Sequence, residues 1–412
     1  MKIASALSLA LAVGTLASNA AQPKFRSLFN GKDLTGWVGN GYTVEDGTIV
    51  CTPEGKNLVT QEVFCNYVLE FDFKLPPGGN NGLGIHYPGA GDGAYTGMEL
   101  QILDNTDPQY KDIKDYQYHG SLYTMAPAKR TGLKPVGEWN HERVTVFDSS
   151  VTVVLNGETI LEANLAELSA THPKHEGVKR RAGQIGWLGH GDRVAFRNIE
   201  IAETAPLPKP DRETASKFTP LFNGQNLDGW KHGGSPEWTV INGILKHSGK
   251  PGTPSDLWTE KEYGDFTLVF DWRWSGRGPT QSRPNVLPDG SQIGQSDIEE
   301  LDSGIYLRGN SKSQVNLWNW PVGSGEIYGY RTDPAMPAAV RAGATPRSKA
   351  DRPVGEWNHT SITLKGDRIS VTLNGTTVIE NAQLPNIPAR GAIGLQHHGS
   401  RIDFANIAIK AD

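Results

Sequence analysis

The chain has 412 residues and a formal net charge of −5. This length exceeds one ordinary β-sandwich and suits two domains of roughly 150–200 residues each. A negative net charge without any basic run excludes nucleic acid as an expected partner. The composition is globular, with 37% hydrophobic and 21% charged residues, and the 48 glycines, 26 prolines and 11 tryptophans favour short strands, many turns and aromatic-lined surfaces.

The first 21 residues have the pattern of a secretory signal peptide. Lys2 supplies a positive charge, residues 7–16 form a short apolar run, and small residues up to Ala20 and Ala21 offer cleavage sites. The run is too short to span a bilayer, and no cysteine lies near the cleavage site to carry a lipid anchor. The sequence therefore predicts a periplasmic or secreted protein without a membrane span. The alternative is a buried N-terminal helix.

Four sequence blocks occur twice in the same order, which indicates an internal duplication. The pairs are 28–37 with 221–230, 137–141 with 355–359, 155–157 with 373–375, and 183–201 with 391–409. The offset rises from 193 to 218 and then falls to 208, so the second copy gains an insertion and then lacks a loop that corresponds to 172–181. We predict one domain over 22–205, a Pro-rich linker over 206–214 and a second domain over 215–412.

Each copy has the alternating pattern of β-strands. Residues 67–73 alternate apolar and acidic side chains, and 266–274 repeat the pattern. Asn156-Gly157 predicts a hairpin turn between arms at 143–155 and 158–161, and Asn374-Gly375 predicts the same turn in the second copy. Only 164–169 could form a helical turn. The sequence therefore predicts an all-β protein made of two sandwiches or jelly rolls.

The predicted strand at 98–104 is the first candidate for a functional surface. Strand alternation places Glu99, Gln101 and Leu103 on one face and apolar residues on the other, while Asp104 falls at the strand end. A face of this kind either lines a groove or is solvated at a sheet edge.

The matching segment of the second copy, 313–320, has Gln314 and Asn316 in the places of Glu99 and Gln101. Trp318 and Trp320 follow in the same segment. Amides and indoles suit a sugar, because amides pair with hydroxyl groups and pyranose faces stack on rings. The alternative is ordinary aromatic packing.

Several polar residues occupy matching positions around these strands. His86 aligns with Arg308, and the segment from His119 to Tyr123 aligns with 323–328, which places Glu326 near Ser121. The last predicted hairpin carries His190 in the first copy and His397-His398 in the second. A single histidine is more often structural than catalytic, whereas several converging on one face would indicate a site.

Two other features allow more than one interpretation. The acidic segment 297–302 is a solvated loop, a Ca²⁺ site or a glycosidase-type carboxylate pair. Cys51 and Cys65 form a disulfide or remain two unpaired thiols. The sequence contains no zinc-ligand spacing, P-loop or nucleophile-elbow motif.

Taken together, the motifs resemble the 3-keto-disaccharide hydrolase domain family. They are LFNGxxLxGW, SGIYLRG, ExQxxD, GEWN, LNG and GxIGLQxHGxxxxFxNIxI, and the resemblance covers about 25–203 and 218–410. It implies a concanavalin- or laminin-G-like jelly roll in each copy, an exported protein, and an oligosaccharide or glycoside ligand. The implied activity is cleavage of glycosides already oxidised at C3 of the sugar.

This chemistry limits what a site needs. A C3 ketone acidifies the hydrogen on C2, so a general base removes it and a donor or cation stabilises the enolate. The C1 substituent then leaves and water adds. The resemblance implies His86, Glu99 or His119 as the base, and Arg308, Tyr123 or a divalent metal (calcium or a transition metal) as the stabiliser. Expected substrate-binding residues are Gln101, Asp104, Gln314, Asn316, Trp318, Glu326, Gln396 and His397.

The two copies depart from the family pattern in different ways. The first has His86 where the family more often has arginine, and the second has Gln314 where the family more often has glutamate. We therefore expect the first copy to keep the acid/base groups, and the second to bind sugar or to complete a shared cleft. The alternatives are a non-catalytic, lectin-like module and a conventional glycosidase that uses the acids at 297–302.

Overall fold

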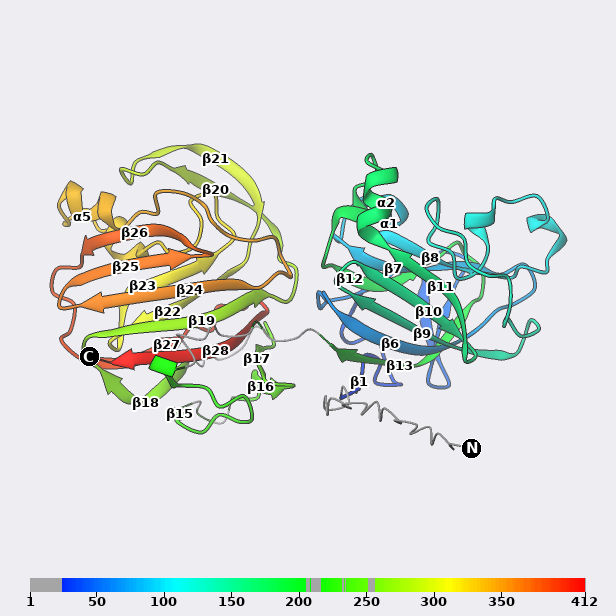
Figure 1. Ribbon diagram of the computed structural model, residues 1–412, viewed down its shortest axis with the longest axis horizontal. Helices are drawn as coiled ribbons and strands as arrows, with labels where there is room; N and C mark the ends of the chain where they lie inside the picture. The colour runs from blue at the N-terminus through cyan, green and yellow to red at the C-terminus, as the bar shows by residue number, and fades with distance from the viewer. Residues whose placement is uncertain are drawn as a thin grey trace, which may run out of the picture.

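The computed structural model describes residues 24–204, 208, 216–231, 233, 235–250 and 256–411. The predicted signal peptide at 1–21 and all of the predicted linker except residue 208 lie outside these ranges. Within them, no helix combines the length and the apolar character needed to cross a membrane. The described strands form two separate β-sandwiches side by side (Figure 1).

The first sandwich packs an eight-stranded sheet against a five-stranded sheet. The larger sheet runs β11 (Glu158–Asn164), β10 (Ser150–Leu155), β9 (Trp139–Phe147), β6 (Tyr67–Lys74), β13 (Ala195–Glu203), β4 (Thr48–Cys51) and β3 (Tyr42–Glu45), with β1 (Arg26–Ser27) paired to β13. The smaller sheet runs β2 (Trp37–Gly39), β5 (Asn57–Thr60), β12 (Gln184–Leu188), β7 (Asn80–Tyr87) and β8 (Met98–Leu103). All described strand pairs are antiparallel.

The second sandwich repeats this arrangement and adds a hairpin. Its larger sheet runs β16 (Trp238–Ile241), β17 (Ile244–His247), β28 (Ile402–Ala411), β19 (Phe266–Trp274), β24 (Asn358–Lys365), β25 (Arg368–Leu373) and β26 (Thr376–Gln383), with β14 (Thr219–Pro220) paired to β28. The smaller sheet runs β15 (Trp230–Lys231), β18 (Leu257–Tyr263), β27 (Gly391–Leu395), β22 (Asp302–Leu307) and β23 (Asn310–Trp318). The extra hairpin is β20 (Thr280–Val286) and β21 (Gln292–Glu299), in the segment where the offsets predict an insertion.

Helices are short and lie in the connections. They are α1 (Gly93–Thr96), α2 (Leu165–Thr171), α4 (Tyr328–Arg331) and α5 (Ala338–Gly343), with 3₁₀ turns η1 (Pro108–Tyr110), η2 (Asp115–Gln117) and η3 (Gly177–Lys179). The helical turn expected at 164–169 is α2, and Asn164 caps it by accepting hydrogen bonds from the backbone of its first turn.

The Asn-Gly turns form as predicted, but the strand before each turn is shorter than expected. Asn156 and Gly157 both have positive φ, as a two-residue turn between β10 and β11 requires. The expected arm 143–155 is two strands, β9 and β10, because the chain reverses at Asp148, which also has positive φ. Residues 361–373 divide in the same way into β24 and β25.

Aromatic side chains fill the space between the sheets of each domain. In the first, Trp187 of β12 stacks on Phe196 of β13 with ring centroids 3.7 Å apart, which joins the two sheets. In the second, Trp272 of β19 is fully buried and donates its indole N–H to Thr360 of β24. These cores bury one face of each smaller sheet, so its other face points away from the core.

Charged residues join the two domains. Glu203, at the end of β13, is paired with Arg273 and with Lys246 of the second domain, the latter at 2.6 Å. Asp403 of β28 pairs with the same arginine at 2.9 Å. Burial alone would raise the pKa of Glu203, but the two cations hold it well below its usual range. A backbone hydrogen bond of 3.0 Å from Val63 to the Ser275 carbonyl also crosses the interface.

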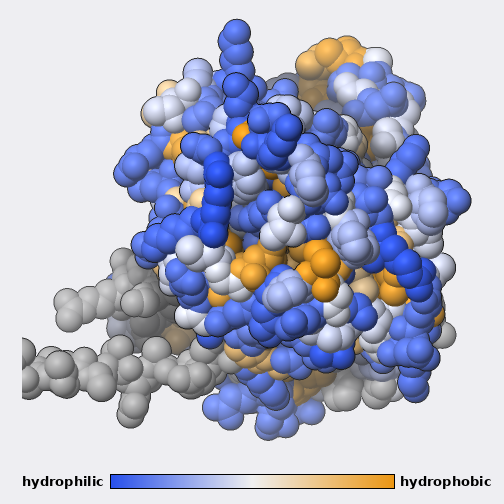
Figure 2. Space-filling model, turned by 90° about the vertical axis from the view of Figure 1, so that its right-hand side faces the viewer, coloured by the Kyte–Doolittle hydropathy of each residue, from blue (hydrophilic) through white to orange (hydrophobic). Residues whose placement is uncertain are grey.

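The face of the first domain that points away from the second is mainly hydrophilic, with a small hydrophobic patch near its centre (Figure 2). This surface character suits a polar ligand better than a large apolar partner.

Candidate active site

A pocket of about 280 Å³ lies on the outer face of the smaller sheet of the first domain. Strands β7 and β8 form its floor, and residues of α1, the 110–117 connection and the β12–β13 loop form its walls. Glu99, Gln101 and Leu103 line it, whereas Met98, Leu100 and Ile102 point into the core. The faces predicted for this strand are therefore confirmed.

Glu99 supplies the buried acid of the pocket. The residue is only 4% exposed, and its Oε1 atom accepts no hydrogen bond. Burial raises the pKa of its carboxyl, because the charged form loses hydration. A carboxylate of this kind accepts a proton more readily than an exposed one.

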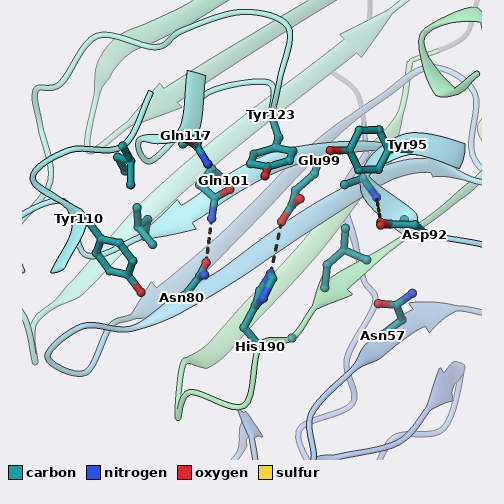
Figure 3. A pocket seen from close by; sticks show the side chains of 16 residues that line it. Asn57, Asn80, Asp92, Tyr95, Glu99, Gln101, Tyr110, Gln117, Tyr123 and His190 are labelled. Atoms are coloured by element: carbon teal, nitrogen blue, oxygen red, sulfur yellow. Dashed lines mark hydrogen bonds and ion pairs between the residues drawn. The ribbon is translucent and has the colours of Figure 1, made fainter. Parts of the chain in front are cut away.

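His190, on the β12–β13 loop, faces this acid (Figure 3). Its Nε2 atom lies 4.0 Å from Oε1 of Glu99, which is longer than a hydrogen bond and leaves the interaction electrostatic. The Glu99 carboxylate raises the pKa of His190. The imidazole is half exposed, so it can meet a ligand that enters from solvent.

Polar groups with fixed positions surround the pair. Gln101 donates to the side-chain oxygen of Asn80 at 2.8 Å, which orients both amides (Figure 3). Tyr123 packs edge-on against Tyr95, with ring centroids 6.4 Å apart. Burial raises the pKa of the Tyr123 phenol, so this group stays protonated and able to donate.

Gly82 makes room for the acid. A Cβ atom at this position would lie 2.0 Å from Oε1 of Glu99. Gly82 pairs with Gln101 across β7 and β8, so the missing side chain leaves space directly over the neighbouring strand. In the second domain, Gly304 leaves the same space for Gln314, where a Cβ would lie 2.2 Å from Nε2.

His86, an expected base, does not reach the pocket. It is fully buried, and its ring nitrogens lie 3.1 Å from the Arg180 carbonyl and 3.3 Å from the Cys65 carbonyl. Burial lowers the pKa of this imidazole to about 4. His86 is therefore not placed to act as the base of this pocket, and its contacts are structural.

His119 and Asp104 also lie outside the residues that line the pocket. His119 is buried with Nε2 3.0 Å from Oε2 of Glu142, beneath the sheet rather than on its open face. Asp104 accepts hydrogen bonds from the backbones of Gly78 and Thr106. Burial alone would raise the pKa of Asp104, but the hydrogen bond from the Thr106 hydroxyl and these backbone hydrogen bonds lower it. Its role is to hold the loops at the strand end.

The second domain has a pocket of about 340 Å³ on the matching face. Gln314, Asn316, Trp318 and Gln396 line it, as their expected binding role requires. Gln314 donates to the Gln396 side chain at 2.7 Å. The first-domain pocket and this one share no lining residue. A separate pocket of about 500 Å³ lies between the domains and is lined by Gln61 and Gln184 of the first and by Arg277 and Arg401 of the second, so a shared cleft stays a prediction.

Three expected site residues of the second domain lie elsewhere. Arg308 has positive φ, like His86, and donates to the carbonyls of Gly264, Gly366 and Pro388 and to Asp265. Glu326 is fully buried beside Arg331. His397 contacts the Lys250 carbonyl and the ring of His247. Each of these side chains is occupied within the fold.

The structure also shows the contacts of the acidic segment 297–302 and the state of the two cysteines. Of the acidic segment, Glu299 pairs with Arg277 and Glu300 with Arg283, while Asp302 lines the second pocket. Cys51 and Cys65 are free thiols. In the part of the chain that the structure describes, no three His, Cys, Asp or Glu side chains gather in a way that could hold a metal ion.

Several pocket residues were not among the expected site residues. They include Asn80, Gln117 and His190 in the first pocket and Asp302, Tyr328 and His398 in the second. The repeat offset of 208 aligns His190 with His398, so this pair could have been found by asking which histidine both copies share. Asn80 and Asp302 lie on a neighbouring strand, and only the sheet register brings them to the pocket.

Comparisons with known proteins match both halves of the chain to one family model. The model describes a 3-keto-alpha-glucoside-1,2-lyase-like domain and matches residues 24–202 and 217–410. A 3-keto-disaccharide hydrolase from Bacteroides thetaiotaomicron is 31% identical in an alignment of 224 residues that covers 42% of this chain and 77% of that protein.

Solved structures also show similarity. A protein from Parabacteroides distasonis, provisionally named a glycosyl hydrolase, has 28% identity and a TM-score of 0.39, over 44% of this chain and 94% of its own. The carbohydrate-binding module CBM66 from Bacillus subtilis has 16% identity and a TM-score of 0.28, over 45% and 98% of the two chains.

Proposed function

Because this chain belongs to the 3-keto-alpha-glucoside-1,2-lyase-like domain family, as the resemblance in its sequence predicted, we propose that its first-domain pocket cleaves 3-keto-glycosides. The observation that carries the proposal is the buried Glu99 carboxylate, which faces His190 across a pocket lined with amides and tyrosines. The reaction needs one base, one donor to the enolate and one acid for the leaving group. The pocket contains a group suited to each role.

Glu99 is the base. It takes the proton from C2, which the C3 ketone has made acidic, and the electron pair of the C–H bond forms the enolate. Its raised pKa favours this step, because a more basic carboxylate accepts a carbon-bound proton more readily. Burial also keeps water from competing for the carboxylate.

Tyr123 and His190 complete the reaction. The protonated phenol of Tyr123 donates to the enolate oxygen. When the enolate collapses, a C1–C2 double bond forms and the C1–O bond breaks, and protonated His190 gives its proton to the leaving oxygen. Water then adds at C1 and a proton returns to C2, so the sum is hydrolysis of the glycoside.

The amides bind the sugar hydroxyl groups. Gln101 and Asn80 hold each other in place by their hydrogen bond and still have unused donor and acceptor positions. Gln117, which also lines the pocket, adds a third amide. Such groups fix the orientation of the ring relative to Glu99.

The test replaces Glu99 with glutamine in the full-length protein. We expect Glu99→Gln to lower the release of sugar from a 3-keto-glucoside while the affinity for that compound is retained. Glu162→Gln is the matched control, because it makes the same glutamate-to-glutamine change at an exposed position of β11. Equal turnover in wild type and Glu99→Gln would contradict the proposal, and binding without turnover by the wild type would indicate a carbohydrate-binding module.

We also propose that the protein is exported to the periplasm or beyond, on the signal-peptide pattern of residues 1–21. N-terminal sequencing of the mature protein is expected to begin at Ala21 or Gln22. An intact Met1 on protein isolated from the producing cell would contradict export by this signal.

A further inference from the structure

The sequence comparison suggests that the second domain has lost its acid, because Gln314 replaces Glu99. The pocket itself contains a carboxylate from another strand. Asp302 is the first residue of β22 and pairs with Trp318 across to β23. In the first domain, Asn80 starts β7 and pairs with Leu103 of β8. Asp302 therefore occupies the position of Asn80, one strand away from the position of Glu99.

The histidine partner is present in both pockets. His398 lies on the β27–β28 loop, as His190 lies on the β12–β13 loop. Its Nδ1 atom is 3.5 Å from Oδ2 of Asp302. The acid and the histidine thus face each other in the second pocket as they do in the first.

A tyrosine completes the correspondence. Gln101 exchanges backbone hydrogen bonds with Gly120 and Ser121, at 2.7 and 3.0 Å. Asn316 exchanges the same two bonds with Gly325 and Glu326, at 2.8 and 2.9 Å. Two residues after each of these segments come Tyr123 and Tyr328, and each lines the pocket of its own domain.

We propose that the second domain contains a second catalytic site for 3-keto-glycosides, in which Asp302 is the base, His398 the acid and Tyr328 the donor to the enolate. This inference rests on the proposed function of the first pocket. The proton transfers and bond changes are those given for Glu99, His190 and Tyr123, with water as the second reactant.

The charges around Asp302 support its role as a base. The groups that face it are His398, Glu300 before β22, Arg283 on β20 and Tyr306 on β22 itself. Burial and Glu300 raise the pKa of Asp302 to about 6, against the opposing effects of His398 and Arg283. A base with this pKa is deprotonated at neutral pH and still accepts a proton effectively.

The inserted hairpin makes this pocket different in shape. Arg283 of β20 forms a two-point salt bridge with Glu300 and lies over the ring of Trp320, 4.8 Å from its centroid. Trp320 in turn stacks on Trp318, which stands in the place of Leu103. With Tyr328 44% exposed at the same pocket, the second site presents an aromatic wall that suits a glycoside with a large or planar leaving group.

The test compares Glu99→Gln, Asp302→Asn and the double variant in the full-length protein, with a 3-keto-glucoside and 3-keto-trehalose as substrates. We expect Glu99→Gln to retain part of the turnover, with an acidic limb of its pH profile near pH 6. Adding Asp302→Asn should lower that remaining turnover by at least ~10²-fold. Asp228→Asn is the control, because Asp228 lies in an exposed turn of the same domain.

The outcomes separate the two proposals. If Glu99→Gln alone is as inactive as the double variant, the second pocket does no chemistry and the first proposal stands. If even the double variant keeps full turnover, both proposals fail. Should Asp302→Asn lower the folded fraction, Glu300→Gln in the Glu99→Gln background replaces it. Glu300 raises the pKa of Asp302, so its removal must move the acidic limb to lower pH, and an unmoved limb would overturn the assignment.

Discussion

The two domains have the same sheets in the same order, yet their pockets hold the acid on different strands. In the first, Glu99 on β8 is the acid and Asn80 on β7 is the amide. In the second, Asp302 on β22 is the acid and Gln314 on β23 is the amide. The histidine stays on the matching loop. A pocket on a sheet is therefore defined by side chains from neighbouring strands together, and a change at one aligned position does not show that a charge is lost.

Moving the acid between strands is the change with the largest expected effect. In an Asp302→Asn background, Glu99→Gln should lower kcat by ~10²–10⁴-fold, because neither carboxylate proposed as the base remains to take the C2 proton. Adding Asn80→Asp restores a carboxylate at the position that the second domain uses, and should recover activity by at least about tenfold. The measurement is kcat with a 3-keto-glucoside.

No recovery from Asn80→Asp, in a variant that still folds and binds the substrate, would mean that the two strand positions are not interchangeable. The comparison between the pockets would then be one of shape only.

The ion pairs between the domains provide the next test. Glu203 has no acidic counterpart in the second domain, where the offset of 208 places Ala411. Glu203→Gln leaves Arg273 and Lys246 with less compensation in a buried position and should reduce the free energy of unfolding by about 3–5 kcal/mol. Denaturant unfolding measures this loss, and Glu200→Gln on the exposed side of β13 is the control.

Glu203 should also make the free energy of unfolding depend on pH. The folded state holds the pKa of Glu203 below its unfolded value, so its contribution to stability is fully present above the unfolded pKa of about 4.5 and is lost as the pH falls. Wild type should therefore lose more stability than Glu203→Gln between pH 5 and pH 3. Parallel pH curves for the two proteins would show that Glu203 is not held by these cations.

Substitutions of the two glycines that face Glu99 and Gln314 should have a smaller effect on turnover, and they compare the two pockets directly. Gly82→Ala places a Cβ against Glu99, so the carboxylate must move, and the first-pocket kcat should fall by about 10²-fold. Gly304→Ala displaces Gln314 and not the acid, so turnover at the second pocket should fall less. Gly264→Ala is the control, since its Cβ would meet only an ordinary contact at 3.6 Å.

The smallest expected effect is a shift in pH dependence. Glu300 raises the pKa of Asp302, and Arg283 lowers it. Glu300→Gln removes the first influence and frees Arg283 from its salt bridge, so the acidic limb of the Glu99→Gln protein should move to a pH below 6. The pH profile of kcat/KM measures this, and a limb that moves upward would contradict the role given to Asp302.

The sequence predicted the fold and part of the first pocket. Alternation placed Glu99 and Gln101 on one face and Leu100 in the core, because side chains of a strand point to opposite sides. The strands before Asn156 were predicted as one because no Gly or Pro marks the turn at Asp148. His86 and Arg308 were correctly aligned, but an alignment does not show which groups a side chain contacts in the folded protein.

By itself, the sequence determined the duplication, the sandwich class, the family and the face on which Glu99 lies. Each of these depends on local spacing or on motifs within one strand or turn. The tertiary structure alone decided which charged groups meet. His190 approaches Glu99 from a loop about 90 residues away, and Asp302 lies beside the position of Gln314, on the neighbouring strand, because β22 and β23 pair in one register. Pairings of this kind depend on contacts distant in the chain, which strand alternation does not encode.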